Sequence, residues 1–250
     1  MVELLGLAYS PWTEKARWAL DARSIPFRFR HYQPLVGEPE LRWRLRRLTG
    51  PVSVPVLVTD DGRWLGDSAV IARWADERGE GPRLFPAEHA AAIAHLIELS
   101  ERAMSAGRAL SLARVLEDDE ALAEMVSRKL RRALGPAAVR VGSAGVKRTV
   151  RKYGGGRKNL DQHRADLGAA LDELRSALAK APTIFDDFSF ADIAMAQALA
   201  FVRPPSTGLK LGEASRRSFS DPPFSERYAD LLAWRDELYR AHRGPAPLRR

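Results

Sequence analysis

The chain has 250 residues, of which 45% are hydrophobic, so it is long enough to form two domains with packed cores. It contains no cysteine, which excludes a disulfide framework, a cysteine nucleophile and thiolate metal sites. No apolar run approaches the roughly 18 residues of a membrane span, and the N-terminus lacks the pattern of a signal peptide. The formal net charge is +8, and we expect a soluble, cytoplasmic protein that binds no membrane.

The first 80 residues alternate between short apolar runs and amphipathic stretches, which is typical of strands and helices in a mixed sheet. We predict strands at 2–7, 27–32, 55–59 and 63–65, and helices at 11–23, 38–48 and 67–78. Asp61-Gly62 is a hairpin turn between the last two strands. This order predicts a domain over 1–80 in which helices cover a small mixed sheet.

After a linker at 79–86 the composition becomes helical, which predicts an all-helical domain over 87–250. We predict helices at 87–116, 118–134, 161–180 and 225–241, with a proline-rich loop at 203–223. Ser189 and Asp192 have the spacing of a capping box, and Phe188 and Ile193 occupy the positions of a hydrophobic staple. A further helix therefore begins after Ser189, and the expected fold class is α/β plus all-α.

The second domain contains a strongly basic insertion at about 135–158. From Arg128 to Lys158 there are eleven lysines and arginines and no acidic residue. Its several glycines are helix breakers, so we predict that much of 135–158 is a mobile loop. Because only Tyr153 supplies an aromatic ring, we favour a solvated insertion over a nucleic-acid site.

Three short signals fall at predicted strand ends and helix starts in the first domain. Ser10-Pro11 begins a helix, and its serine hydroxyl lies in the positive field of the helix N-terminus. That hydroxyl can either cap the helix or stabilise a ligand thiolate, and spacing alone favours the cap. Val54-Pro55 leads into a strand, and Asp67-Ser68 begins another helix, where capping is again the simpler interpretation.

Together these signals resemble the thioredoxin-like N-terminal domain of cytosolic glutathione transferases. The resemblance is closest to the tau and omega type pattern, in which Ser-Pro-aromatic or Cys-Pro-aromatic precedes the first helix. Here that stretch is Ser10-Pro11-Trp12, followed by Val54-Pro55-Val56-Leu57 and Asp67-Ser68. The resemblance extends over the whole chain, because the capping box of the second domain is also a feature of the family.

The resemblance implies a role for each matching residue. Ser10 would activate the thiol of glutathione, with Tyr9 as the alternative. Val54, with a cis peptide bond to Pro55, would pair with the cysteinyl backbone. Asp67 and Ser68 would hold the γ-glutamyl end. No metal is implied.

Other positions in the resemblance are less well matched. Ser53 stands where many relatives have a basic residue that contacts the glycyl carboxylate. An arginine of the helix at 38–48 could replace that residue; the candidates are Arg42, Arg44, Arg46 and Arg47. The second-substrate pocket would be lined by Trp12 and by three positions of the long helix, namely Met104, Arg108 and Ser111.

Two functions follow from these patterns. The first is a glutathione transferase that conjugates glutathione to a small, apolar electrophile, as in detoxification, and works as a homodimer. Since reductions in this family use a protein cysteine, Ser10 favours conjugation over reduction. The second is a non-catalytic binding protein, as in stringent-starvation-type proteins, with the basic insertion as its contact surface. We do not expect nucleic acid as a partner.

Overall fold

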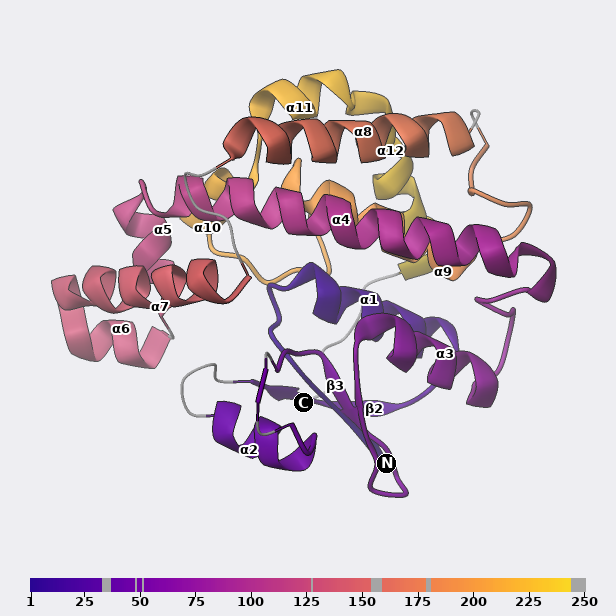
Figure 1. Cartoon of the computed structure of the whole chain (residues 1–250), viewed down its shortest axis with the longest axis horizontal. Coiled ribbons are helices and arrows are strands. Elements are labelled where there is room, and N and C mark those ends of the chain that lie inside the picture. Colours follow the sequence, from indigo (N-terminus) through magenta and orange to yellow (C-terminus); the bar gives the residue numbers. More distant parts are fainter. Residues whose placement is uncertain are drawn as a thin grey trace.

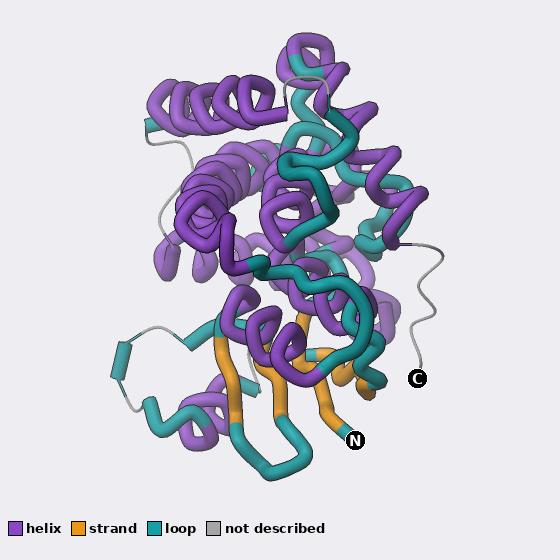
Figure 2. The backbone as a smooth tube through the Cα atoms, turned by 90° about the vertical axis from the view of Figure 1, so that its right-hand side faces the viewer, coloured by secondary structure: helices purple, strands orange, loops and turns teal. Residues whose placement is uncertain are grey.

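The computed structural model describes residues 1–32, 37–47, 49–50, 52–126, 128–153, 159–178 and 181–243. A sheet with its helices forms one end of the molecule, and a larger group of helices forms the other (Figure 1). Figure 2 shows that the strands lie together in the first of these parts, as predicted. None of the described helices has the length and hydrophobicity needed to cross a bilayer.

The sheet has four strands, β1 (Val2–Gly6), β2 (Phe27–His31), β3 (Val56–Val58) and β4 (Trp64–Gly66), in the order β2-β1-β3-β4. β1 is parallel to β2, and β3 is antiparallel to both β1 and β4. This confirms the predicted mixed sheet.

Helices cover both faces of the sheet because residues of β1 alternate between them. Leu4 packs with residues of α1 (Pro11–Ala22) and α3 (Ser68–Arg78), whereas Leu5 packs with Leu41 of α2 (Glu38–Arg44). The α2 helix is shorter than predicted, since it ends at Arg44 and not at residue 48.

The helical part is built around α4 (Ala90–Val115), which packs against α8 (Leu160–Leu178) and α9 (Phe190–Ala198). The predicted helix at 118–134 is two helices, α5 (Asp119–Glu124) and α6 (Arg128–Leu134). The predicted helix at 225–241 is also divided, into α11 (Pro222–Arg227), α12 (Ala229–Leu238) and a π-helical turn (Tyr239–Arg243). It starts early because Asp221 caps α11 ahead of two prolines. The short α10 (Glu213–Phe219) lies inside the proline-rich loop.

The prediction of a mobile loop at 135–158 is wrong for the described part of that segment. A 3₁₀ turn at Gly135–Ala137 leads into α7 (Ala138–Tyr153), while residues 154–158 lie outside the described residues. Ala138, Gly142 and Val146 form a buried stripe, and α7 packs against α5. A Cβ on Gly142 would lie 1.9 Å from the carbonyl oxygen of Leu122, so this glycine allows close helix packing and does not break the helix.

The capping box and the staple of α9 are both present. The Asp192 carboxylate accepts hydrogen bonds from the backbone N–H groups of Ser189 and Ile184, each at 2.8 Å. Ile193 and Phe188 pack with Trp18 of α1, so this end of α9 joins the two parts of the molecule. Burial raises the pKa of Asp192, and its role here is structural.

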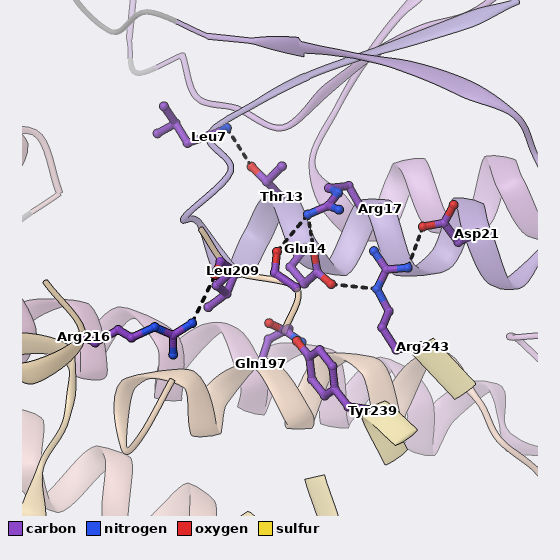
Figure 3. A network of polar contacts seen from close by, with 11 residues as sticks. Leu7, Thr13, Glu14, Arg17, Asp21, Gln197, Leu209, Arg216, Tyr239 and Arg243 are labelled. Atoms are coloured by element: carbon purple, nitrogen blue, oxygen red, sulfur yellow. Dashed lines mark hydrogen bonds and ion pairs between the residues drawn. The ribbon is translucent and has the colours of Figure 1, made fainter. Parts of the chain in front are cut away.

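A buried ionic network joins the end of the described chain to α1 (Figure 3). Glu14 accepts hydrogen bonds from Arg17 at 2.8 Å and from Arg243 at 2.7 Å. Arg243 also pairs with Asp21 at 2.6 Å. The π-helical turn is thereby fixed beside the first domain.

Candidate functional site

The sheet topology brings the three predicted signals to one edge of the first domain. Because β3 runs antiparallel to β1, the start of β3 lies beside the end of β1, and Leu5 pairs with Val56. Val56 also pairs with Gly66 at the end of β4. The segments 7–10, 52–55 and 66–68 are therefore neighbours.

Ser10 is the N-cap residue of α1, but its hydroxyl makes no capping hydrogen bond. Its backbone N–H donates to the carbonyl of Leu7, and its carbonyl accepts from the N–H of Glu14. Pro11, at the first helical position, needs no N–H partner. Ser10 is half-buried, and its hydroxyl has no hydrogen-bond partner among the described residues, so it can donate to a ligand at the positive end of the helix.

Tyr9 lies next to Ser10 and is also half-buried. Burial raises the pKa of Tyr9 to about 12, so its hydroxyl stays protonated at neutral pH. A serine hydroxyl is also protonated at this pH, so acidity does not separate the two candidates, and Ser10 is favoured by its place at the N-terminus of α1.

The Val54-Pro55 peptide bond is cis, as the family resemblance implied. Pro55 is buried and Val54 is half-buried. Among the described residues, neither the N–H nor the carbonyl of Val54 has a backbone hydrogen-bond partner. Both groups are available to pair with an extended peptide.

Asp67 caps α3, and its carboxylate accepts from the N–H of Ala69 at 2.7 Å. Its backbone has φ 73°, an unusual value for a residue other than glycine and one that is often found at binding sites. Ser68 follows with only 2% of its surface exposed, and its hydroxyl has no hydrogen-bond partner among the described residues. This unpaired hydroxyl lies at a helix N-terminus, which favours an anionic ligand, although its oxygen is itself buried in this structure.

Of the four candidate arginines, Arg42 and Arg44 lie in α2 and Arg46 and Arg47 follow it. Arg42 pairs with Glu38 at 2.7 Å and donates to the carbonyl of Gly50. Arg44 lies over the rings of Trp43 and Trp64. The side chains of Arg46 and Arg47 are exposed.

A cation that sequence reasoning missed lies beside Ser53. Lys152, near the end of α7, donates from Nζ to the carbonyl of Val52 at 2.5 Å. Arg148, one turn earlier, pairs with Glu38 of α2 at 2.9 Å. The absence of acidic residues from 128–158 shows in the sequence that this segment is strongly basic. Its contacts with the first domain are visible only in the folded structure.

The predicted second-substrate residues are brought together only in part. Arg108 lies between two rings, 4.7 Å from the centroid of Trp12 and 4.4 Å from that of Tyr153. Met104 and Ser111 are fully buried and present no surface to a ligand in this structure. Ser111 accepts a hydrogen bond from Arg114, and Met104 belongs to the core of the helical part.

The proline-rich loop lies near the site, because the N–H of Lys210 donates to the carbonyl of Ala8 at 2.9 Å. The basic tail at 244–250 is outside the described residues. A separate cavity of about 460 Å³ lies between α8 and α11 and contains none of the predicted site residues.

Two sequence models of domain families match the chain. "Glutathione S-transferase, N-terminal domain" matches residues 9–78, and "Glutathione S-transferase, C-terminal domain" matches residues 157–237. All the predicted glutathione-contacting residues fall within the first match. Residues 79–156, which include α7, fall outside both matches.

Curated relatives match over a short stretch. A Solanum tuberosum protein named "Probable glutathione S-transferase" is 31% identical over 87 residues, which are 34% of this chain and 37% of that protein. A Nicotiana tabacum protein of the same name is 33% identical over 87 residues, or 34% of this chain and 36% of that protein. The match thus covers little more than a third of each relative's length.

Solved structures match over nearly the whole chain. A glutathione S-transferase from Methylobacillus flagellatus with GSH bound has a TM-score of 0.61 and 19% identity, covering 99% of this chain and 100% of that one. A glutathione transferase family member from Pseudomonas fluorescens, with bound glutathione, also has a TM-score of 0.61 and 19% identity, covering 99% of this chain and 96% of that one. At these identities the structures show a shared fold, and the two domain models agree with it. The chain belongs to the glutathione S-transferase family.

Proposed function

We propose that this protein is a glutathione transferase that conjugates the glutathione thiolate to a small, apolar electrophile. The observation that carries the proposal is a set of unused polar groups at one sheet edge: the Ser10 hydroxyl, the Val54 backbone and the Ser68 hydroxyl. These groups match a thiol, an extended peptide backbone and a carboxylate, which are the three parts of glutathione.

Each group has a defined task in this reaction. The Ser68 hydroxyl and the N-terminus of α3 bind the γ-glutamyl carboxylate, while Val54 pairs with the cysteinyl main chain. The Ser10 hydroxyl donates to the sulfur, which lowers the pKa of the thiol from about 8.5 as its proton passes to solvent. The thiolate then forms a bond to the electrophilic carbon as the leaving group departs. No covalent intermediate with the protein is needed.

The electrophile binds beside Trp12 and Arg108, on the helical side of the site. The Trp12 indole N–H donates to Glu101 at 2.6 Å, which fixes the orientation of the ring. Arg108 contributes a flat, partly desolvated cation, since burial lowers its pKa. The Trp12 ring and the Arg108 guanidinium group together suit an aromatic electrophile with a polar substituent. We expect the working form to be a homodimer in the cytoplasm.

Replacing Ser68 with alanine tests the site without disturbing the fold. We expect the dissociation constant for glutathione to rise about tenfold, because a hydrogen bond to a carboxylate is lost. The melting temperature should not fall, since the variant removes a buried hydroxyl that has no partner among the described residues. Calorimetry and thermal unfolding measure the two effects.

The control is Ser176→Ala, because Ser176 is exposed and donates only to a carbonyl of its own helix, α8. It should bind glutathione like the wild type. Absence of glutathione binding by the wild-type protein at millimolar concentration would favour the second candidate, a non-catalytic binding protein. That candidate is supported by the exposed cations of α7, such as Arg140 and Arg151.

A further inference from the structure

The positions of Ser68 and Val54 define a direction for the bound tripeptide, if the proposed function holds. Because Gly66 pairs with Val56, Asp67 and Ser68 lie beside the start of β3. A peptide that has one end at Ser68 and pairs with Val54 must extend its other end along Ser53 and Val52. That other end carries the glycyl carboxylate.

Three basic side chains lie near this end of the site, and two of them share one carboxylate. Arg42 and Arg148 both pair with Glu38, and these hydrogen bonds lower its pKa. The charge of Lys152 also lowers the pKa of Glu38, but Lys152 has no carboxylate within ion-pair distance among the described residues. Its ammonium group donates one hydrogen bond, to Val52, and carries three N–H groups in all. Lys152 therefore has both charge and donors available for an anion.

The fold holds Lys152 in position from several sides. Gly142 and Val146 fix α7 against the helical part, and Arg148 fixes it against α2. At the end of α7, the Tyr153 ring packs against Arg108, which also covers Trp12. The ammonium group is thus placed before the ligand arrives, which lowers the entropy cost of binding.

We propose that Lys152 binds the glycyl carboxylate and so supplies, from the helical domain, the positive charge that Ser53 lacks. The inference rests on the proposed function and deepens it. The glutathione site is then built from both domains, and α7 lies over its glycyl end. Since α7 lies outside both domain-model matches, neither match accounts for this residue.

The test compares two ligands and three proteins by calorimetry. The ligands are glutathione and its glycyl ethyl ester, in which an uncharged ester replaces the glycyl carboxylate. The proteins are the wild type, Lys152→Met and the control Lys147→Met. Lys147 is an exposed cation of the same helix whose side chain makes no contact with the first domain among the described residues. Both substitutions remove one positive charge and keep a long apolar side chain.

We expect wild type and Lys147→Met to bind the ester about tenfold more weakly than glutathione. Lys152→Met should bind glutathione about tenfold more weakly than wild type and should not distinguish the two ligands. If Lys152→Met still binds the ester about tenfold more weakly than glutathione, the assignment of Lys152 is overturned, while glutathione binding by the protein is not. Failure of the wild type to bind either ligand would overturn the proposed function, and this inference with it.

Discussion

Replacing Ser10 with alanine is expected to lower kcat/KM for conjugation at neutral pH by about tenfold to thirtyfold, with little change in glutathione affinity, because the pKa of the bound thiol returns from near neutrality to about 8.5. The Ser10 hydroxyl has no capping bond to maintain, so its removal should cost little stability. Its donor function matters only when the sulfur is charged, and that charge is present on the thiolate and not on the resting thiol. The loss should therefore appear in turnover more than in binding.

The measurement is the pH dependence of conjugation of an aryl halide by wild type, Ser10→Ala, Ser10→Thr and Tyr9→Phe. In Ser10→Ala the activity should increase with pH, and the apparent pKa of this increase should be near the ordinary thiol value of about 8.5, because the bound thiol loses its stabilising donor. Ser10→Thr keeps a hydroxyl and should recover part of the rate. Unchanged activity in Ser10→Ala, together with a loss in Tyr9→Phe, would transfer the role to Tyr9.

The second large effect concerns stability. Glu14→Gln is expected to lower the free energy of unfolding by about 3–5 kcal/mol, because Arg17 and Arg243 would lose the carboxylate they share in a buried site. The Glu14 side chain is 0% exposed and those of Arg17 and Arg243 are 3% and 1% exposed, so water cannot replace the lost carboxylate. Urea denaturation of wild type and variant measures the difference.

Glu77→Gln is the matched control. Glu77 pairs with Arg78 at the surface, where its side chain is 68% exposed, and its removal should change stability by less than about 1 kcal/mol. In Glu14→Gln, a second substitution, Arg17→Gln, should recover part of the loss, because Arg17 pairs with no other carboxylate among the described residues, whereas Arg243 keeps its pair with Asp21. A loss below about 1 kcal/mol in Glu14→Gln would show that the network contributes little.

The elements that the sequence predicted best are those set by local periodicity. Leu4 and Leu5 face opposite sides of the sheet because side chains alternate along a strand, and Ser189 with Asp192 marks a helix start by spacing alone. The segments of the proposed glutathione site were predictable for the same reason, since they are strand ends and helix starts.

The features that escaped prediction depend on contacts between distant residues. Gly142 looks like a helix breaker until the backbone of Leu122 is seen against it. Met104 lies at helical spacing from Arg108, but spacing does not say which neighbour covers it, and here it is the core. Lys152 and Val52 are 100 positions apart, so no local pattern joins them.

If this protein conjugates glutathione as proposed, its site stabilises the thiolate of the bound tripeptide. The ultraviolet absorbance of the thiolate tests this directly, followed against pH in a saturated complex of wild-type protein and glutathione. We expect the bound thiol to have a pKa well below its ordinary value of about 8.5, near neutrality. A bound thiol that titrates at the same pH as free glutathione would contradict it.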